Sequence, residues 1–241
     1  QRVVLQFLSL AIFVALLVTM SGCTLFGRKV TPTTPLTYPW LDLTSGSQWT
    51  YQVSDPSVGS YTEDYTVVGL ETFNNESATK VEHKISLTTS TTTEYDFYKE
   101  GSGSILHLGK TIWKTTEKPD STTTYTPNTA KAYPINLKVG DTFHQIFTST
   151  TNDATGTKEE KKDFTFVVLA EEEFISSIGP VKTLKISMVD NAAAAAGTTS
   201  KATIWLIANG IGIVKFSSEI IDTQGTTISK VNKDLLWYTL K

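Results

Sequence analysis

Apolar and polar residues alternate along most of this chain, in short runs that turn residues separate. Runs such as 49–53 and 61–68 place every second side chain on one face, which is typical of a strand with one buried side. About a dozen such runs fit an antiparallel curved sheet, a sandwich or a half-barrel. The pattern therefore predicts an all-β fold.

Two segments depart from this alternation. The alanine run of 191–197 is too short to nucleate a helix alone, so we expect a loop or a single turn there. Residues 3–20 form a nearly continuous apolar run behind Arg2, which predicts a hydrophobic signal helix at the N-terminus. The length of that run also overlaps what a membrane-spanning anchor needs, so its own pattern leaves both interpretations open.

One pattern of residues occurs twice in the β-rich part of the chain. Leu43-x-x-Gly46-x-x-Trp49 returns as Leu137-x-x-Gly140-x-x-Phe143. Further landmarks follow in the same order, at 65–68 and 164–168, at 84–86 and 185–187, and at the glycine pairs Gly101 with Gly103 and Gly210 with Gly212. The order predicts two similar β-rich halves, 38–132 and 133–241. The alternative is that turn glycines and aromatic residues recur in any β protein.

The repeated glycines have predicted roles in the backbone. Gly46 and Gly140 read as turn positions with a positive φ, each bringing an aromatic residue to the start of a strand. The two Gly-x-Gly pairs would let the chain kink between closely packed strands.

The residues after the apolar run are Met20, Ser21, Gly22 and Cys23, and they resemble a bacterial lipobox. The resemblance implies that a signal peptide, 1–22, is removed and that Cys23 carries a lipid which anchors the protein to a membrane. Met20 departs from the commoner Leu. The alternative is a chance cysteine after an ordinary anchor. Residues 23–37 would then form a flexible tether, because they contain prolines and no apolar period.

The same resemblance predicts the location of the protein. A lipidated protein of this type lies in the cell envelope, outside the cytoplasm. The residue after the cysteine is Thr24 and not Asp. In Gram-negative sorting this implies release to the outer membrane.

Composition excludes one class of partner. The chain has 241 residues with 21 basic and 24 acidic side chains, which gives a net charge of −3. Phosphate recognition depends on clustered Lys and Arg, so we expect no nucleic-acid partner. Cys23 is the only cysteine, which excludes a disulfide within one chain.

The candidate chemistry is sparse. His83, His107 and His144 lack partners at metal-ligand spacings, and Glu82 faces away from its neighbour His83 if both lie on a strand. No hydrolase or zinc-protease motif is present. We therefore expect no metal, no cofactor and no enzymatic activity. The acidic run 171–173 is interpreted as a solvated hairpin tip and the mixed run 158–163 as a charged hairpin.

The aromatic residues provide the functional lead. Five tryptophans, Trp40, Trp49, Trp113, Trp205 and Trp237, with nine tyrosines, either fill the core or line an apolar groove. The segments 137–143 and 205–215 resemble runs in uncharacterised bacterial lipoproteins, and the predicted architecture resembles curved-sheet lipoproteins of the LolA/LolB type. This resemblance implies a carrier that binds lipid or a lipoprotein. The alternative is a structural or adhesive module that binds another envelope protein, which predicts no cavity.

Overall fold

The computed structural model of the chain describes residues 40–113, 119–195, 197–207 and 211–241. These described residues belong to one compact unit. The predicted signal peptide and tether, with Met20, Ser21, Gly22 and Cys23, lie outside the described residues, as does Gly210. Within the described ranges, no helix has both the length and the hydropathy needed to cross a membrane.

Strands make up most of the described chain. The strands of the first half are β1 (Gln48–Asp55), β2 (Gly59–Phe73), β3 (Glu76–Ser86), β4 (Thr91–Gly101), β5 (Ser104–Trp113) and β6 (Ser121–Thr126). Those of the second half are β7 (Ala132–Pro134), β8 (Thr142–Asp153), β9 (Gly156–Ser176), β10 (Gly179–Asp190), β11 (Thr199–Ile207), β12 (Gly212–Ile221) and β13 (Thr227–Thr239). The alanine run forms the short helix α2 (Asn191–Ala195), about one turn long, between β10 and β11.

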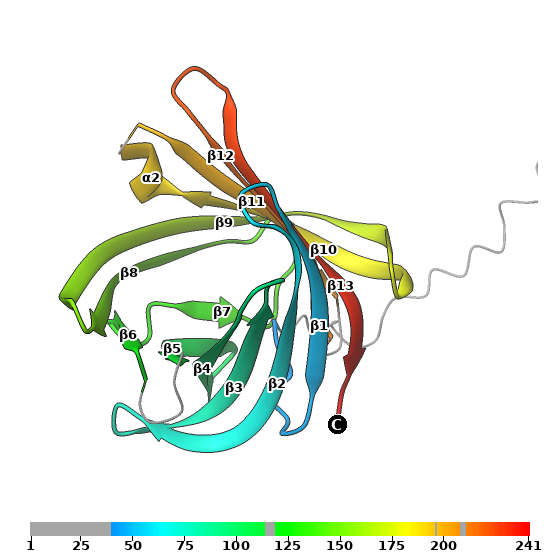
Figure 1. Ribbon diagram of the computed structural model, residues 1–241. Coiled ribbons are helices and arrows are strands. Elements are labelled where there is room, and N and C mark those ends of the chain that lie inside the picture. Colours follow the sequence, from blue (N-terminus) through cyan, green and yellow to red (C-terminus); the bar gives the residue numbers. More distant parts are fainter. Residues whose placement is uncertain (1–39, 114–118, 196, 208–210) are drawn as a thin grey trace, which may run out of the picture. The chain divides into compact units, whose positions relative to one another are not determined.

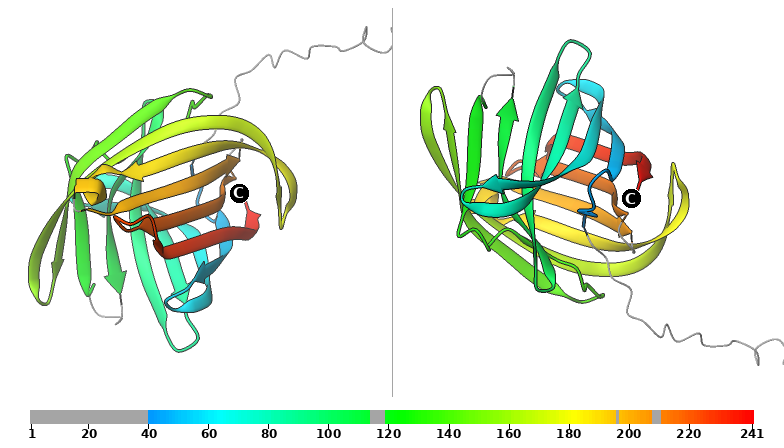
Figure 2. Two further views of the ribbon diagram at one scale, coloured as in Figure 1. Left: turned by 90° about the horizontal axis from the view of Figure 1, so that it is seen from above. Right: turned by 90° about the horizontal axis from the view of Figure 1, so that it is seen from below.

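The sheet closes into a twelve-stranded antiparallel barrel. Neighbours in the sequence are neighbours in the sheet except at β7, which pairs only with β5 and stands outside the ring of twelve, so that β6 pairs with β8. The last strand, β13, returns to pair with β1, as the red and blue strands in Figure 1 show. The pairing of β4 with β5 completes the ring, and Figure 2 shows it from above and below. The all-β prediction is confirmed, but the half-barrel and sandwich are wrong. Closure pairs Gln48 with Thr239, and no local pattern encodes a contact between such distant residues.

One stretch of the barrel wall is interrupted. The strands β6 and β7 run along the same edge of β5, β6 beside Gly109–Ile112 and β7 beside Ser104–Leu106. Between them, the main-chain N of His107 donates a hydrogen bond to the carbonyl of Lys131, at 3.0 Å. The link holds the connecting segment against β5.

The two halves make the same turn at their first strand. The main-chain N of Gly46 donates to the carbonyl of Val67, and the N of Gly140 donates to the carbonyl of Val168, at 2.8 and 2.9 Å. In each case the valine N donates in return to the residue after the glycine. The φ angles of Gly46 and Gly140 are 89° and 92°, a region that only glycine adopts without strain.

The halves also share their strand irregularities. The register shifts by one residue after Val67 in β2 and after Val168 in β9. It shifts again where β4 meets β5, beside Tyr98, and where β11 meets β12, beside Leu206. Strands β1–β6 therefore correspond in order to β8–β13. We propose that 38–132 and 133–241 are two copies of one six-stranded unit.

The Gly-x-Gly pairs do not occupy corresponding positions. Gly103 has a φ of 79° in the tight turn between β4 and β5, just after Gly101 at the end of β4. Gly212 begins β12 with a φ of 83°, and a Cβ there would lie 2.5 Å from the carbonyl oxygen of Trp40. The strand register aligns Gly212 with Leu106 instead of Gly103.

Both charged runs lie in one strand. The mixed run 158–163 follows the turn of the β8–β9 hairpin, which agrees with its interpretation as a charged hairpin, whereas the interpretation of the acidic run 171–173 as a hairpin tip is wrong. Residues 158–163 and 171–173 both belong to β9, whose neighbouring turns lie at 153–156 and 176–179. Glu171 forms an ion pair with Lys182 on β10, and Glu172 accepts a hydrogen bond of 2.6 Å from Trp205 Nε1. Cross-strand partners of this kind satisfy charged residues within a long strand.

Candidate functional site: a cavity inside the barrel

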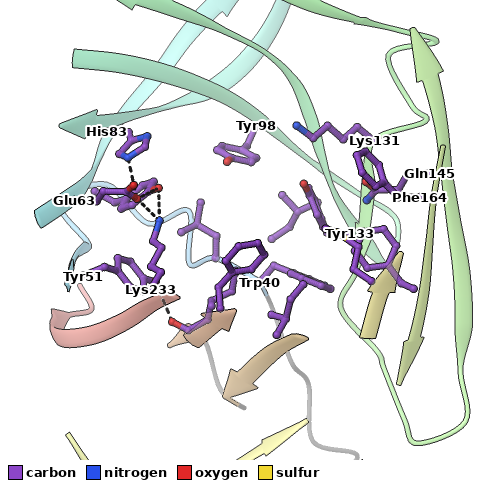
Figure 3. A pocket seen from close by; sticks show the side chains of 18 of the residues that line it. Trp40, Tyr51, Glu63, His83, Tyr98, Lys131, Tyr133, Gln145, Phe164 and Lys233 are labelled. Atoms are coloured by element: carbon purple, nitrogen blue, oxygen red, sulfur yellow. Dashed lines mark hydrogen bonds and ion pairs between the residues drawn. The ribbon is translucent and has the colours of Figure 1, made fainter. Parts of the chain in front are cut away.

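The barrel encloses a cavity of about 610 Å³ (Figure 3), a size within the usual range of small-molecule sites. Alternate residues of each strand point inward, so nearly every strand contributes to the lining. The aromatic lining residues are Trp40, Trp49, Tyr51, Tyr61, Tyr65, Tyr98, Tyr125, Tyr133, Phe147, Phe164, Phe166 and Phe216. The charged ones are Glu63, His83, Lys131, Lys162 and Lys233.

The segment before β1 enters the cavity through Trp40. Its Nε1 donates a hydrogen bond of 3.0 Å to the carbonyl of Pro134, and its ring centre lies 5.0 Å from that of Tyr133. Tyr133 and Pro134 lie in the segment of the second half that corresponds to the segment before β1. The two corresponding segments therefore contact each other at Trp40. Because the indole is fixed by a hydrogen bond and by ring packing, it forms a rigid part of the lining.

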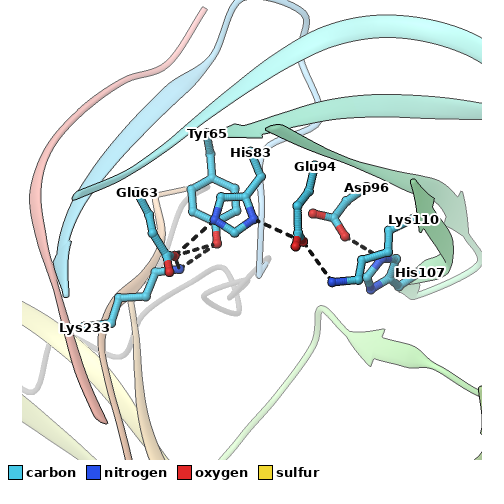
Figure 4. A network of polar contacts seen from close by, with 8 residues as sticks. All are labelled: Glu63, Tyr65, His83, Glu94, Asp96, His107, Lys110 and Lys233. Atoms are coloured by element: carbon cyan, nitrogen blue, oxygen red, sulfur yellow. Dashed lines mark hydrogen bonds and ion pairs between the residues drawn. The ribbon is translucent and has the colours of Figure 1, made fainter. Parts of the chain in front are cut away.

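A set of polar side chains lies along the interior on strands of the first half, together with Lys233 on β13 of the second half; it is called the polar network below (Figure 4). Its members are Glu63, Tyr65, His83, Glu94, Asp96, His107, Lys110 and Lys233. Sequence reasoning missed this network, because it joins residues of β2, β3, β4, β5 and β13 that are widely separated along the chain.

Glu63 is the centre of one end of the network. It pairs with the ammonium of Lys233, accepts a hydrogen bond of 3.0 Å from the Tyr65 hydroxyl and lies 3.2 Å from His83 Nε2. Burial alone would raise the pKa of the Glu63 carboxyl, but His83 and Lys233 outweigh it and lower the pKa to about 2. Glu63 is therefore ionised at neutral pH.

His83 connects this end to the next carboxylate. Its ring stacks on Tyr65 with centres 4.1 Å apart, and its Nδ1 lies 3.8 Å from Glu94. Burial would lower the pKa of His83, but the carboxylates Glu63 and Glu94 raise it. Glu94 in turn accepts a hydrogen bond of 2.8 Å from Lys110 Nζ.

Asp96 and His107 form the other end. His107 Nε2 lies 2.9 Å from Asp96 Oδ1, close enough for an ion pair but not aligned as a hydrogen bond. Burial, reinforced by the charge of Lys131, lowers the pKa of His107 to about 4 against the opposing effect of Asp96. Burial would raise the pKa of Asp96, and contact with His107 lowers it. At neutral pH the pair is an ionised carboxylate beside a neutral imidazole.

Three groups of the network could in principle ligate a metal ion. Ligand atoms of His83, Glu94 and Asp96 lie within 4.8 Å of one another. Each carboxylate already has a protein partner, however, because Glu94 contacts Lys110 and Asp96 contacts His107. An ion would have to displace those contacts, so the arrangement is that of an ion-pair network.

The same contacts bear on enzymatic chemistry. Clustered carboxylates are a common feature of hydrolytic sites, where one of them must be held protonated to act as an acid. Here the pKa values of Glu63, Glu94 and Asp96 are all lowered. The network supplies no protonated carboxyl group at neutral pH.

The second half carries apolar residues at the positions that correspond to six of the eight network residues. The pairs of corresponding positions, from the strand register, are Glu63 and Phe164, His83 and Met188, Glu94 and Ala202, Asp96 and Ile204, His107 and Ile213, and Lys110 and Phe216. The second residue of each pair belongs to what is called the apolar wall below. The barrel interior thus has the polar network on one side and the apolar wall on the other, with Lys162 on β9 as a further charged residue of the lining.

The tryptophans of the sequence prediction separate into two groups. Trp40 and Trp49 line the cavity. Trp205 lies on the opposite face of β11 from the lining residue Ile204, and Trp237 is 45% exposed. Trp113 packs edge-on against Tyr95, with ring centres 6.0 Å apart. The aromatic residues therefore do more than fill the core.

The histidines also separate. His83 and His107 are buried in the network, whereas His144 is exposed on β8 within 3.2 Å of the Thr165 hydroxyl. Alternation did indicate that Glu82 and His83 point apart, and Glu82 indeed pairs with Lys84 and not with His83. No spacing in the sequence could have joined His83 to Glu63 and Glu94.

Comparison with known proteins finds two solved structures that are similar to this chain. No protein-family model and no curated protein sequence matches the chain. One similar structure is a candidate lipoprotein from Parabacteroides distasonis, with 11% identity and a TM-score of 0.45. Another is a candidate exported protein with a YmcC-like fold from Bacteroides fragilis, with 10% identity and a TM-score of 0.46. Each alignment covers 86% of this chain and 100% of the neighbour. Likenesses of this size carry no inference about the function of this chain.

Proposed function

We propose that this protein is a lipid-anchored binding protein of the cell envelope whose barrel takes up an amphipathic molecule. The observation that supports this most is the contrast between the polar network and the apolar wall. A purely structural barrel would gain stability by filling its interior on both sides, since an empty apolar space costs packing energy. A ligand with a polar part and an apolar part would complement both sides at once.

The location in this proposal rests on the lipobox resemblance. Lipid on Cys23 would tether the barrel through residues 23–37, outside the cytoplasm and, in a Gram-negative source, at the outer membrane. A diacylglycerol contributes about 0.8 kcal/mol for each buried CH₂ group, which makes it a lasting anchor. The tether joins the described chain at Trp40, which itself lines the cavity.

The alternative function was a structural or adhesive module with a packed interior. A packed interior is incompatible with the cavity. Exposed apolar side chains such as Leu70 and Ile175, which are 81% and 83% exposed, are present on the outside. They belong to different halves of the chain, and single exposed apolar residues are ordinary in soluble domains.

Native mass spectrometry of the protein purified from its own envelope tests both parts of the proposal. We expect a co-purifying amphipathic molecule and a mass increase at the N-terminus from acylation. Met188→Trp, which would fill cavity space from the apolar wall, should lose the bound molecule. Ile175→Trp adds a similar bulk on the exposed surface and should retain it. A ligand-free wild-type barrel contradicts the binding proposal, and an unmodified Cys23 contradicts the anchor.

A further inference from the structure

Lys131 occupies a special place in the cavity wall. It lies in the segment between β6 and β7, and the hydrogen bond from His107 N to its carbonyl fixes its backbone on β5. Its side chain lines the cavity, and its ammonium lies 4.1 Å from the centre of the Tyr125 ring and 5.8 Å from that of Phe147. The ammonium therefore sits over aromatic faces at the border of the cavity.

The other lysines near the cavity all contact a carboxylate. Lys233 pairs with Glu63, Lys110 with Glu94 at 2.8 Å, and Lys162 with Glu160 at 2.7 Å. Lys131 makes no ion pair with any described residue. The carboxylate of Asp96 acts on it only at longer range and already contacts His107.

An ammonium without a counter-charge lowers the stability of the fold when it lies over aromatic rings at the border of a cavity. Removal of a charge from water is offset only when a counter-charge or well-placed hydrogen bonds replace the lost solvent. Aromatic faces return only part of that loss. A residue that stabilises the empty barrel so poorly is better explained by a partner that arrives with the ligand.

We infer that Lys131 binds the anionic group of the ligand, and that the ligand is a single-chain amphiphile bearing a carboxylate or a phosphate. This inference rests on the proposed function and names the ligand class for the same cavity. Figure 3 shows Lys131 on the far side of the cavity from the Glu63–Lys233 pair. The anionic group would therefore contact Lys131 without competing with Glu63, while the hydrocarbon chain packs against aromatic residues and the apolar wall.

The test uses chain 24–241, because the strand pairings of the described residues, including the closure of β13 on β1, all lie within 48–239. Dissociation constants for dodecanoate, dodecyl phosphate and neutral dodecanol are measured by titration calorimetry at pH 7. We expect one or both anions to bind the wild-type chain roughly ten- to hundred-fold more tightly than dodecanol, the range of a charge-assisted hydrogen bond. The tighter of the two anions identifies a carboxylate or a phosphate ligand.

Variants assign the effect to Lys131. Lys131→Met should reduce anion binding to the level of dodecanol and leave dodecanol within twofold, and Lys131→Arg should restore the preference. Lys162→Met is the matched control, because that lysine also lines the cavity but is already paired with Glu160, and it should keep the preference. If Lys131→Met does not fold, Lys131→Gln replaces it in the same titrations.

The outcomes separate this inference from the proposed function. If dodecanol and both anions bind equally, before and after the Lys131 change, the inference is wrong while the binding proposal stands. A preference that depends on Lys162 instead of Lys131 overturns it as well. If none of the three molecules binds the wild-type chain, the proposed function itself fails.

Discussion

The two halves of the barrel share a backbone plan but differ in interior chemistry. The turns at Gly46 and Gly140 make the same hydrogen bonds, and the bulges beside Val67 and Val168 fall at corresponding positions. At the corresponding interior positions the first half nevertheless carries charges and the second half carries apolar residues. The difference teaches that the barrel does not require polar residues at these positions, since the second half builds the corresponding strands with apolar side chains there.

The polar network is thus better explained by function than by stability. Buried ion pairs are often no more stabilising than apolar residues of similar volume, because desolvation offsets the attraction of the charges. In the proposed function, the polar network would contact the polar part of the ligand and the apolar wall would contact its apolar part.

The largest expected effect comes from breaking the pair at the end of the network. Glu63→Gln leaves the buried ammonium of Lys233 without its carboxylate, and we expect the free energy of unfolding to fall by roughly 3–5 kcal/mol. The double change Glu63→Phe with Lys233→Met copies the apolar residue of Phe164 and removes both charges, so its loss should be much smaller. Urea unfolding of chain 24–241 measures both. Equal losses in the single and double variants would show that the charged half needs its ion pair to fold.

A smaller effect follows from the lowered pKa of His107. The folded imidazole stays neutral down to about pH 4, whereas the unfolded one takes up a proton near its ordinary pKa of about 6.5. Stability is therefore full above pH 6.5 and decreases as the pH falls toward 4, by ~3 kcal/mol from this residue. His83, with a raised pKa, acts in the opposite direction, because its protonation favours the folded state.

The two effects are separated by comparison of variants. Thermal unfolding between pH 4.5 and 7 is measured for the wild-type chain and for His107→Gln, which keeps a hydrogen-bond donor beside Asp96. The variant should lack the acid destabilisation, and Ile213→Val on the apolar wall should keep it. Parallel pH curves for wild type and His107→Gln would contradict this assignment.

The smallest effect concerns the shared turns. Gly46→Ala and Gly140→Ala each place a Cβ at a φ near 90°, which costs about 1–2 kcal/mol in both halves. The cost should be greater at Gly46, where the Cβ would meet Lys241 Cγ at 3.2 Å, than at Gly140, where the space is open. Urea unfolding ranks the two variants. If only one of the two substitutions lowers the free energy of unfolding, the equivalence of the two turns does not extend to their stability.

Much of the fold could be predicted from local patterns. Alternation predicted strands at 49–53 and 61–68, which lie in β1 and β2, and the spacing around Gly46 and Gly140 predicted two turns that prove equivalent. The acidic run 171–173 was misplaced at a hairpin tip, because it lies within a strand of 21 residues and its charges are satisfied by partners on β10 and β11. The candidate site was predictable only as a surplus of aromatic residues.

The amino-acid sequence by itself determined the all-β class, the turn glycines and the lipobox-like segment, since each depends on residues that are close together in the chain. The tertiary structure alone decided that β13 closes on β1, that Glu63 meets His83 and Lys233, and that Lys131 has no ion-pair partner within the described part of the chain. The physical reason is that inward-facing side chains interact across the sheet, and the partner of each is chosen by strand register and barrel closure. Neither of those is a property of any short stretch of residues.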